Sequence, residues 1–345
     1  MTPLPDLSDC LAAEHGFSGV VSVDRDGEVE LARAYGLAHR GYGVANTVDT
    51  RFAVASGSKG LTALAVVSLI ERGVLEPGST ARSLLGPDLP LVGDDVTVEH
   101  LLAHRSGIGD YLDEEAGTDI ADYVLGVPAQ DLLSTEQFLA VLDGYPAKFR
   151  PDERFSYCNG GYVLLALLAE RASGVPFHDL VRRAVCEPAG MPDTEFLRSD
   201  QLPERTAVGY LPIEGVDRTN VFHLPVRGNG DGGAYSTVAD MSAFWPSLFA
   251  GRIVSPRWVA EMVRPRSTET GQPWRYGLGF WLHPSSDTVM LEGYDAGVSF
   301  RSVHDPAARL THTVVSNTSD GAWPISRRLG ELLTPSAGPG DVGPP

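Results

Sequence analysis

Lysine, cysteine and long apolar runs are all scarce in this chain of 345 residues. The two lysines are Lys59 and Lys148, and the three cysteines lie far apart and form no Cys-x-x-Cys pair. This cysteine pattern excludes a disulfide scaffold and a cysteine-based zinc module, and it is typical of a reducing compartment. The longest apolar stretches, Leu61–Ile70 and Val163–Ala169, are far shorter than the roughly 20 residues that span a bilayer.

Basic residues are also few, because 27 lysines and arginines stand against 45 aspartates and glutamates, for a formal net charge of -18. A surface this acidic repels phosphate backbones and anionic lipid heads, so we expect no nucleic-acid partner and no membrane partner. The N-terminal segment has no basic start, apolar run or twin arginine, so we expect no signal peptide and a cytoplasmic protein. The sequence carries no signal for an oligomeric state.

Strand-like patterns occur near both ends of the chain, and helical patterns fill the middle. The predicted strands are Phe17–Asp24, Glu28–Ala38, Arg275–His283, Thr288–Gly293, Val298–His304 and Leu310–Ser316. The predicted helices are 6–15, Ser56–Arg72, Val98–His104, Thr135–Leu142, Gly160–Ala172, Pro176–Val185, Thr237–Ala250 and Trp323–Leu333.

This order of elements predicts an α+β fold, an α/β sandwich in which one antiparallel sheet is built from both chain ends and flanked by the terminal helices. A mostly helical domain is inserted between the two halves of the sheet. We predict a sheet domain from residues 1–60 and 266–333, and a helical domain from residues 61–265. The last residues, 334–345, are rich in proline and glycine and are predicted to be a disordered tail.

One of the two lysines stands three residues after a serine, in Ser56-Gly57-Ser58-Lys59, where a predicted strand turns into a helix. At this spacing the hydroxyl and the amine share a face of the first helical turn. The helix N-terminus favours a developing alkoxide, and a buried lysine there could be neutral enough to act as a base. The alternative is that Ser56 caps the helix and that Lys59 is solvated.

The segment Tyr157-Cys158-Asn159 is the only Tyr-x-Asn in the chain, and it stands just before a predicted apolar helix. A phenol near a lysine can shuttle a proton, and an amide can donate to a substrate carbonyl and accept from the lysine. The alternative is that Tyr157 belongs to the core and that Asn159 caps the helix. Alternation along this segment predicts that Cys158 points into the core, so we do not propose it as a nucleophile.

Two other motifs look like binding sites of different classes. The segment Gly228–Gly233 matches Gly-x-Gly-x-x-Gly, but it lacks the βαβ unit and the acidic ribose partner of a dinucleotide site. We expect it to line the cleft as a glycine-rich loop. His100 and His104 have the spacing of two zinc ligands, but the usual glutamate and a third ligand are missing. We therefore expect no cofactor and no metal, and we expect His104 to hydrogen-bond the backbone near Ser106–Gly107.

The order Ser56-x-x-Lys59, then Tyr157-x-Asn159, resembles the serine β-lactamase/penicillin-binding-protein-like superfamily, in its class C β-lactamase-like branch. That branch includes β-lactamases, DD-peptidases, D-aminopeptidases, esterases and acyltransferases. Further stretches are similar to the same family and stand in its order: Phe17–Val21, Tyr35–Ala38, Asp49–Phe52, Leu101–Ile108, Gly190–Thr194, Gly232–Thr237 and Tyr276–Phe280. The resemblance covers residues 17 to 333 and implies a β-lactamase/transpeptidase-like fold.

The resemblance also implies a role for each motif residue. Ser56 would be the acylated nucleophile, and Lys59 and Tyr157 would take and return its proton, with either of the two as the base. Asn159 would hold Lys59 and the substrate carbonyl, and the backbone N–H of Ser56 would form half of an oxyanion hole.

The chain departs from the family in the third motif, which is a lysine or histidine, a threonine or serine, and a glycine on an edge strand beside the nucleophile. In the aligned stretch Tyr294 replaces the cation, Asp295 replaces the hydroxyl, and Ala296 replaces the glycine. Gly297 would then supply the second oxyanion N–H. The alternative is that Tyr294 and Asp295 only finish a strand turn.

The missing cation and the added carboxylate should weaken binding of anionic substrates by an amount on the order of 1–3 kcal/mol. We therefore expect weak or no β-lactamase activity. Asp295 could instead receive an amine or a hydroxyl, and Arg301 is expected to point elsewhere rather than restore the cation.

These observations predict a serine hydrolase that attacks an ester or amide of a small molecule or peptide through an acyl-enzyme on Ser56, without a cofactor. Ester cleavage is preferred, because the carboxylate-holding cation is missing and no export signal points to cell-wall work. The alternatives are an acyltransferase, a D-amino-acid peptidase or a β-lactamase of the same fold. A further alternative is a non-catalytic ligand-binding relative.

Overall fold

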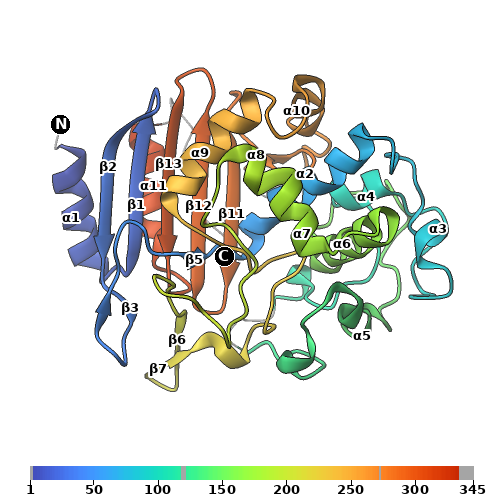
Figure 1. Cartoon of the computed structure of the whole chain (residues 1–345), viewed down its shortest axis with the longest axis horizontal. Helices are drawn as coiled ribbons and strands as arrows, with labels where there is room; N and C mark the ends of the chain where they lie inside the picture. Colours follow the sequence, from blue (N-terminus) through green and yellow to red (C-terminus); the bar gives the residue numbers. More distant parts are fainter. Residues whose placement is uncertain (1–2, 118–121, 272, 334–345) are drawn as a thin grey trace.

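A seven-stranded antiparallel sheet is the frame of the computed structural model, which describes residues 3–117, 122–271 and 273–333 (Figure 1). The strands run in the order β2-β1-β13-β12-β11-β10-β9. Their bounds are β1 Gly19–Arg25, β2 Glu28–Tyr35, β9 Arg275–Tyr276, β10 Trp281–Leu282, β11 Val289–Asp295, β12 Val298–Asp305 and β13 Leu310–Ser316. Because β1 pairs with β13, the two ends of the chain share one sheet.

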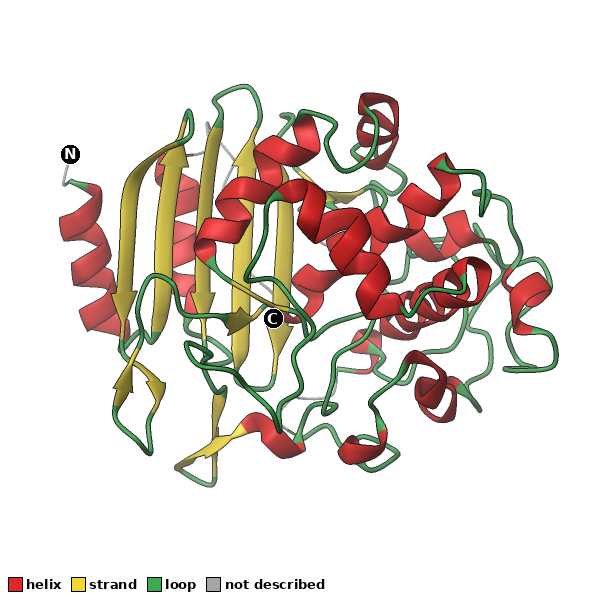
Figure 2. Cartoon of the chain, in the orientation of Figure 1, coloured by secondary structure: helices red, strands yellow, loops and turns green. Residues whose placement is uncertain are grey.

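The sheet has a core on each face, since successive strand residues point to opposite sides. Val20 belongs to the large core shared with the helical part of the chain, whereas its neighbour Val21 belongs to a smaller core. The smaller core lies under α1 (Leu4–His15) and α11 (Ala322–Leu333). On the other face α9 (Val238–Phe249) packs against β1 and β13 (Figure 2).

Two apolar helices form the middle of the helical part, and they position the site described below. Every residue of α2 (Ser58–Glu71) from Ser58 to Ile70 is buried, and α6 (Asn159–Ser173) packs against it. A helix that is apolar all round is stable only when it is covered all round. Shorter helices provide the cover: α3 Ala81–Leu85, α4 Val98–Leu102, α5 Leu139–Leu142, α7 Phe177–Val181, α8 Glu187–Ala189 and α10 Pro256–Met262.

Three pairs of short strands complete the architecture. They are β3 (Leu37–His39) with β4 (Val44–Ala45), β5 (Phe52–Ala53) with β8 (Tyr235–Ser236), and β6 (Tyr210–Ile213) with β7 (Val216–Thr219). Across the described ranges, we find no helix with both the length and the apolar character needed to cross a membrane.

The predicted α+β fold is confirmed, with the sheet built from both chain ends. The predicted single strand Arg275–His283 is wrong in detail, because Gly277–Gly279 turns the chain and leaves two short antiparallel strands. The division into domains at residues 60 and 265 stays a prediction, and α9, from inside the predicted helical segment, lies on the sheet. The predicted tail 334–345 lies outside the described residues.

Candidate active site

Ser56 lies in a single 3-10 turn, Ala55–Gly57, between β5 and α2. The backbone of Ala55 has φ +43°, a left-handed conformation that is uncommon for residues other than glycine. Ser58 holds this turn, because its hydroxyl donates to the Ala55 carbonyl at 2.7 Å and accepts the Ala234 N–H at 3.0 Å. Strained backbone of this kind persists only where its surroundings secure it, and it clusters at functional sites.

Lys59 is buried directly beneath Ser56, with a relative exposure of 2%. Its Nζ donates to Ser56 Oγ at 2.9 Å, to Asn159 Oδ1 at 2.8 Å and to the Asp231 carbonyl at 2.7 Å. An ammonium has three N–H donors, so these contacts use all of them. The structure thus brings together Ser56, Lys59 and Asn159, three of the residues selected from the sequence.

Burial acts in opposite directions on the pKa values of the two candidate bases. It lowers the pKa of Lys59, against the opposing pull of Asp231, Glu114, Asp110 and Asp295. The same burial raises the pKa of Tyr157 well above its ordinary value, against a hydrogen bond with the Ser56 side chain. Relative to water, burial therefore shifts both groups toward their neutral forms.

Asn159 is the first residue of α6, and the carboxylate of Asp110 fixes it there. Asp110 accepts the backbone N–H of Asn159 at 2.6 Å and of Gly160 at 2.8 Å, so it satisfies donors that the helix start leaves open. Burial raises the pKa of Asp110 to about 6, and these N–H groups oppose the shift. The side-chain amide of Asn159 donates to the Leu112 carbonyl at 3.0 Å and to Glu114 Oε1 at 3.3 Å.

His104 also holds the backbone just before α6, but through a different hydrogen bond from the one that we expected. Its Nδ1 accepts the backbone N–H of Cys158 at 3.0 Å rather than bonding the backbone near Ser106–Gly107. Its ring lies 4.3 Å from the ring of Tyr157. The thiol of Cys158 belongs to the large core and accepts the Gly161 N–H.

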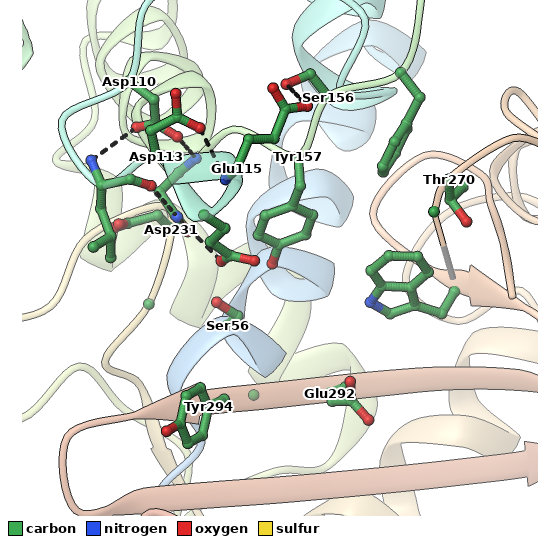
Figure 3. Close-up of a pocket in the computed structure, with 18 of the residues that line it drawn as sticks. Ser56, Asp110, Asp113, Glu115, Ser156, Tyr157, Asp231, Thr270, Glu292 and Tyr294 are labelled. Atoms are coloured by element: carbon green, nitrogen blue, oxygen red, sulfur yellow. Dashed lines mark hydrogen bonds between the residues drawn. The ribbon is translucent and has the colours of Figure 1, made fainter. Parts of the chain in front are cut away.

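Ser56, Tyr157 and Asn159 face one cleft with a volume of about 1100 Å³ (Figure 3). Ser56 and Tyr157 line it together with aromatic residues such as Trp281, which stacks on Tyr157 at 6.0 Å. In Figure 3 Ser56 lies between Tyr157 and the strand that carries Glu292 and Tyr294. The cleft gives the hydroxyl of Ser56 and the phenol of Tyr157 access to a bound molecule, and the amine of Lys59 stays enclosed behind Ser56.

Gly293 of β11 lies against the turn Ala55–Gly57, which carries Ser56. A Cβ at Gly293 would come within 2.0 Å of the Val54 carbonyl and within 3.0 Å of the backbone N of Ser56 and Gly57. Only glycine fits this approach. The glycine of the third motif is therefore Gly293 and not Ala296. In this register Leu291 and Glu292, rather than Tyr294 and Asp295, occupy the positions of the cation and the hydroxyl.

This register changes the assignment of the second oxyanion donor. Gly297 does not fit the expected role, because its N–H donates to Ser319 Oγ at 2.8 Å. The two-residue turn after Asp295 makes Asp295 and Val298 the hydrogen-bonded pair that closes the hairpin. Hydrogen-bonded and non-hydrogen-bonded pairs alternate along an antiparallel ladder, so the N–H of Tyr294 does not bond to β12. It points instead to the open edge of β11. Tyr294 and Asp295 both line the cleft, whereas Gly297 is not among its lining residues.

The glycine-rich segment Gly228–Gly233 accepts hydrogen bonds from two side chains of α2, and it does not form the start of a helix. Its Asp231 carbonyl accepts from Lys59, and its Gly230 carbonyl accepts from the Thr62 hydroxyl at 2.7 Å. His100 caps its own helix through the Thr97 N–H. Within the described ranges no group of three or more histidine, cysteine or acidic residues could hold a metal ion.

Among the carboxylates of the cleft that sequence reasoning missed, three surround Lys59: Asp110, Glu114 and Asp231. The first two follow the helix α4 in a loop without periodicity, and Asp231 stood inside a motif that was weighed for another purpose. No local pattern placed them near Ser56, because each approaches it through a contact between distant parts of the chain.

A family model described as Beta-lactamase matches residues 6–331 of the chain. Penicillin-binding protein 4* of Bacillus subtilis (strain 168) is 30% identical, over 85% of this chain and 66% of that protein. Esterase EstB of Burkholderia gladioli is 30% identical, over 94% of this chain and 87% of the esterase. The chain thus spans just under two thirds of the length of the first of these relatives.

A solved structure agrees with these matches. The penicillin binding protein from Bacillus halodurans superposes with a TM-score of 0.88 at 33% identity, over 94% of this chain and 99% of that one. Fold and sequence therefore point to the same group of proteins.

The close approach of Gly293 yields a stability prediction. Gly293→Ala should lower the free energy of unfolding by about 1–3 kcal/mol, because the new methyl group meets backbone atoms that cannot move aside alone. Gly78→Ala is the control, since a Cβ at Gly78 meets open space and should change stability by less than about 0.5 kcal/mol. Urea unfolding of both variants measures the difference. Equal stability of the two variants would contradict the assigned register.

Proposed function

The chain belongs to the beta-lactamase family of serine hydrolases, and from this premise we propose that it cleaves an ester through an acyl-enzyme on Ser56. The observation that carries the proposal is the 2.9 Å contact from Lys59 Nζ to Ser56 Oγ, with Lys59 buried and held by Asn159 and Asp231. A serine is a weak nucleophile until an adjacent base activates it, and this contact supplies the base.

In the proposed acylation step neutral Lys59 takes the proton of Ser56 Oγ as the oxygen attacks the substrate carbonyl. The lowered pKa of Lys59 supports this role, and the raised pKa of Tyr157 keeps its phenol protonated. Tyr157 then donates its proton to the leaving group and recovers one from Lys59. The backbone N–H groups of Ser56 and Tyr294 are the proposed donors to the oxyanion.

An ester substrate is favoured over the anionic substrates of penicillin-binding proteins. In the corrected register Leu291 occupies the position of the family's cation, and Arg301 is already paired with Glu292 at 2.5 Å. The similarity to an esterase supports the same choice. Amide cleavage and transfer of the acyl group to an acceptor other than water are the second candidates, because the same acyl-enzyme serves them. The proposed substrate is a small molecule or a peptide. A cytoplasmic location stays a prediction.

An acyl-enzyme on Ser56 predicts a burst. Wild-type protein mixed with 4-nitrophenyl butanoate should release about one equivalent of nitrophenol before the steady state, since acylation by an activated ester precedes slower deacylation. Ser56→Ala should show no burst, and Ser83→Ala, at an exposed position of α3, is the control that keeps it. Stopped-flow absorbance gives the amplitude. A burst of equal size in Ser56→Ala would refute the nucleophile.

The proposed proton transfers predict the cost of losing either partner. Lys59→Ala and Tyr157→Phe should each slow acylation by about two to four powers of ten. Lys59→Arg keeps the positive charge but cannot lose its proton, so it should be as slow as Lys59→Ala. Single-turnover rates with the same ester measure all three. Acylation at the wild-type rate in both Lys59→Ala and Tyr157→Phe would exclude this mechanism.

The lowered pKa of Lys59 predicts the pH dependence of acylation. The neutral fraction of Lys59 increases as pH rises, so the acylation rate should climb with pH and level off below 10.5, the ordinary pKa of lysine. Single-turnover measurements between about pH 5 and 11, corrected for hydroxide cleavage, test this. A rate that reaches half of its plateau only at pH 10.5 would show that Lys59 has an ordinary pKa.

A further inference from the structure

Lys148, the second of the two lysines in the chain, lies in the loop before α6 and is the centre of a cluster of polar side chains. Its Nζ donates to Asp113 Oδ1 at 2.9 Å and to Ser156 Oγ at 3.1 Å, and it contacts Glu115 Oε2 at 2.9 Å. These contacts use all three N–H groups of the ammonium. They join the loop that carries the two carboxylates to the residue just before Tyr157.

The two lysines differ in charge as well as in place. Burial lowers the pKa of Lys59. Burial opposes ionisation of Lys148 too, but its hydrogen bonds to Glu115 and Asp113 outweigh that effect and raise its pKa. Lys148 therefore stays positively charged, which suits it to holding carboxylates rather than to moving protons. Its backbone is held separately, because its N–H donates to the Gly107 carbonyl at 2.8 Å.

The loop that Lys148 holds determines the orientation of the Asn159 amide. Nδ2 of Asn159 donates to the Leu112 carbonyl at 3.0 Å and to Glu114 Oε1 at 3.3 Å. A carbonyl can only accept, so the contact with Leu112 decides which end of the amide faces the loop. The other end, Oδ1, is thereby turned to Lys59 Nζ at 2.8 Å.

This orientation decides whether the lone pair of Lys59 is available to Ser56. A neutral amine has two N–H donors and one lone pair. Oδ1 of Asn159 and the carbonyl of Asp231 accept two N–H groups, so the lone pair is left for the hydroxyl of Ser56. An amide turned the other way would present N–H groups to the amine and compete with Ser56 for that lone pair.

Arg154 also pairs with Glu115, but Lys148 is the more enclosed of these two cations. The side chain of Lys148 is 20% exposed, against 47% for that of Arg154. Exposed ion pairs contribute little to stability, because water and salt screen them. Lys148 has further bonds to Asp113 and Ser156, so it is the stronger anchor of the loop.

We propose that Lys148 is a positioning residue for acylation, which holds residues 112–115 so that the oxygen of the Asn159 amide faces Lys59. This inference rests on the proposed acyl-enzyme. Lys148 is not among the described residues that line the cleft, so it acts on the reaction through the loop and not by touching the substrate.

Replacing Lys148 by methionine removes the charge and nearly keeps the length of the side chain. On the pH plateau of acylation, Lys148→Met should lower the burst-phase rate constant with 4-nitrophenyl butanoate by about ten- to a hundredfold, because the base is no longer aligned. The half-saturating ester concentration should change by less than about threefold. Stopped-flow measurements over a range of ester concentrations separate the two quantities. Comparison on the plateau removes any effect of the lost charge on the pKa of Lys59.

Arg171→Met is the matched control. Arg171 lies at the C-terminal end of α6, its side chain is 21% exposed, and it pairs with Asp88 and Glu136 outside the cleft. We expect Arg171→Met to change the acylation rate by less than about twofold. Glu115→Gln breaks the cluster of Lys148 from the carboxylate side and should also slow acylation, so the test does not depend on the folding of one variant. Thermal unfolding verifies that each variant is folded.

A double-mutant cycle with Asn159→Ala tests the route by which Lys148 acts. In the Asn159→Ala background no amide is left to orient, so Lys148→Met should slow acylation by less than about twofold. A merely structural loss would instead slow acylation by the same factor in both backgrounds.

The outcomes separate this inference from the proposed function. A burst in the wild-type protein with an unchanged rate constant in Lys148→Met overturns the inference alone. An effect of Lys148→Met that Arg171→Met matches, or that persists in full without the Asn159 amide, also overturns it. No burst in the wild-type protein overturns the acyl-enzyme, and the inference falls with it.

Discussion

The burial of one amine beneath one hydroxyl is the constraint on which the rest of the site depends. Lys59 is enclosed, so each of its N–H groups needs an acceptor, and the three acceptors come from three distant parts of the chain. One is on the turn before α2, one is at the start of α6, and one is in the glycine-rich loop. The helical part must therefore bring these segments within hydrogen-bond distance of one atom.

The apolar character of α2 and α6 follows from this constraint. A lysine side chain on the first turn of α2 can be enclosed only if α6 covers it, and α6 begins at Asn159. Asp110 and His104 then hold the backbone just before and at that start, Asp110 through Asn159 and His104 through Cys158. The polar contacts thus define the position of the helices, and the apolar contacts supply the free energy that keeps them there.

Local features of the site could be predicted from the sequence, and long-range ones could not. The spacing of Ser56 and Lys59 lies within one helical turn, so the helix itself places the two side chains on one face. The contact of Lys59 with Asn159 spans 100 residues, and the resemblance to a family anticipated it where residue patterns alone left it open. Asp110 and Glu114 lie in a loop, where no period of hydrophobic residues reveals which way a side chain points.

The third motif was assigned from the sequence to residues 294–296, whereas the structure supports residues 291–293. The stretch Gly293–Gly297 offers glycines at both ends and a turn between, so side-chain types alone allow two alignments that differ by three residues. An odd shift along a strand reverses every side chain, and the ring of Tyr294 indeed packs toward Trp323 of α11, away from α2.

What distinguishes the two alignments is the space beside the turn that carries Ser56, where a Cβ at Gly293 would meet the Val54 carbonyl and the backbone N of Ser56 and Gly57. The motif thus requires a residue without a side chain at one position and a free N–H at the next. Because neither requirement depends on the type of side chain, the third motif can lose its cation and hydroxyl and still place the proposed oxyanion donor.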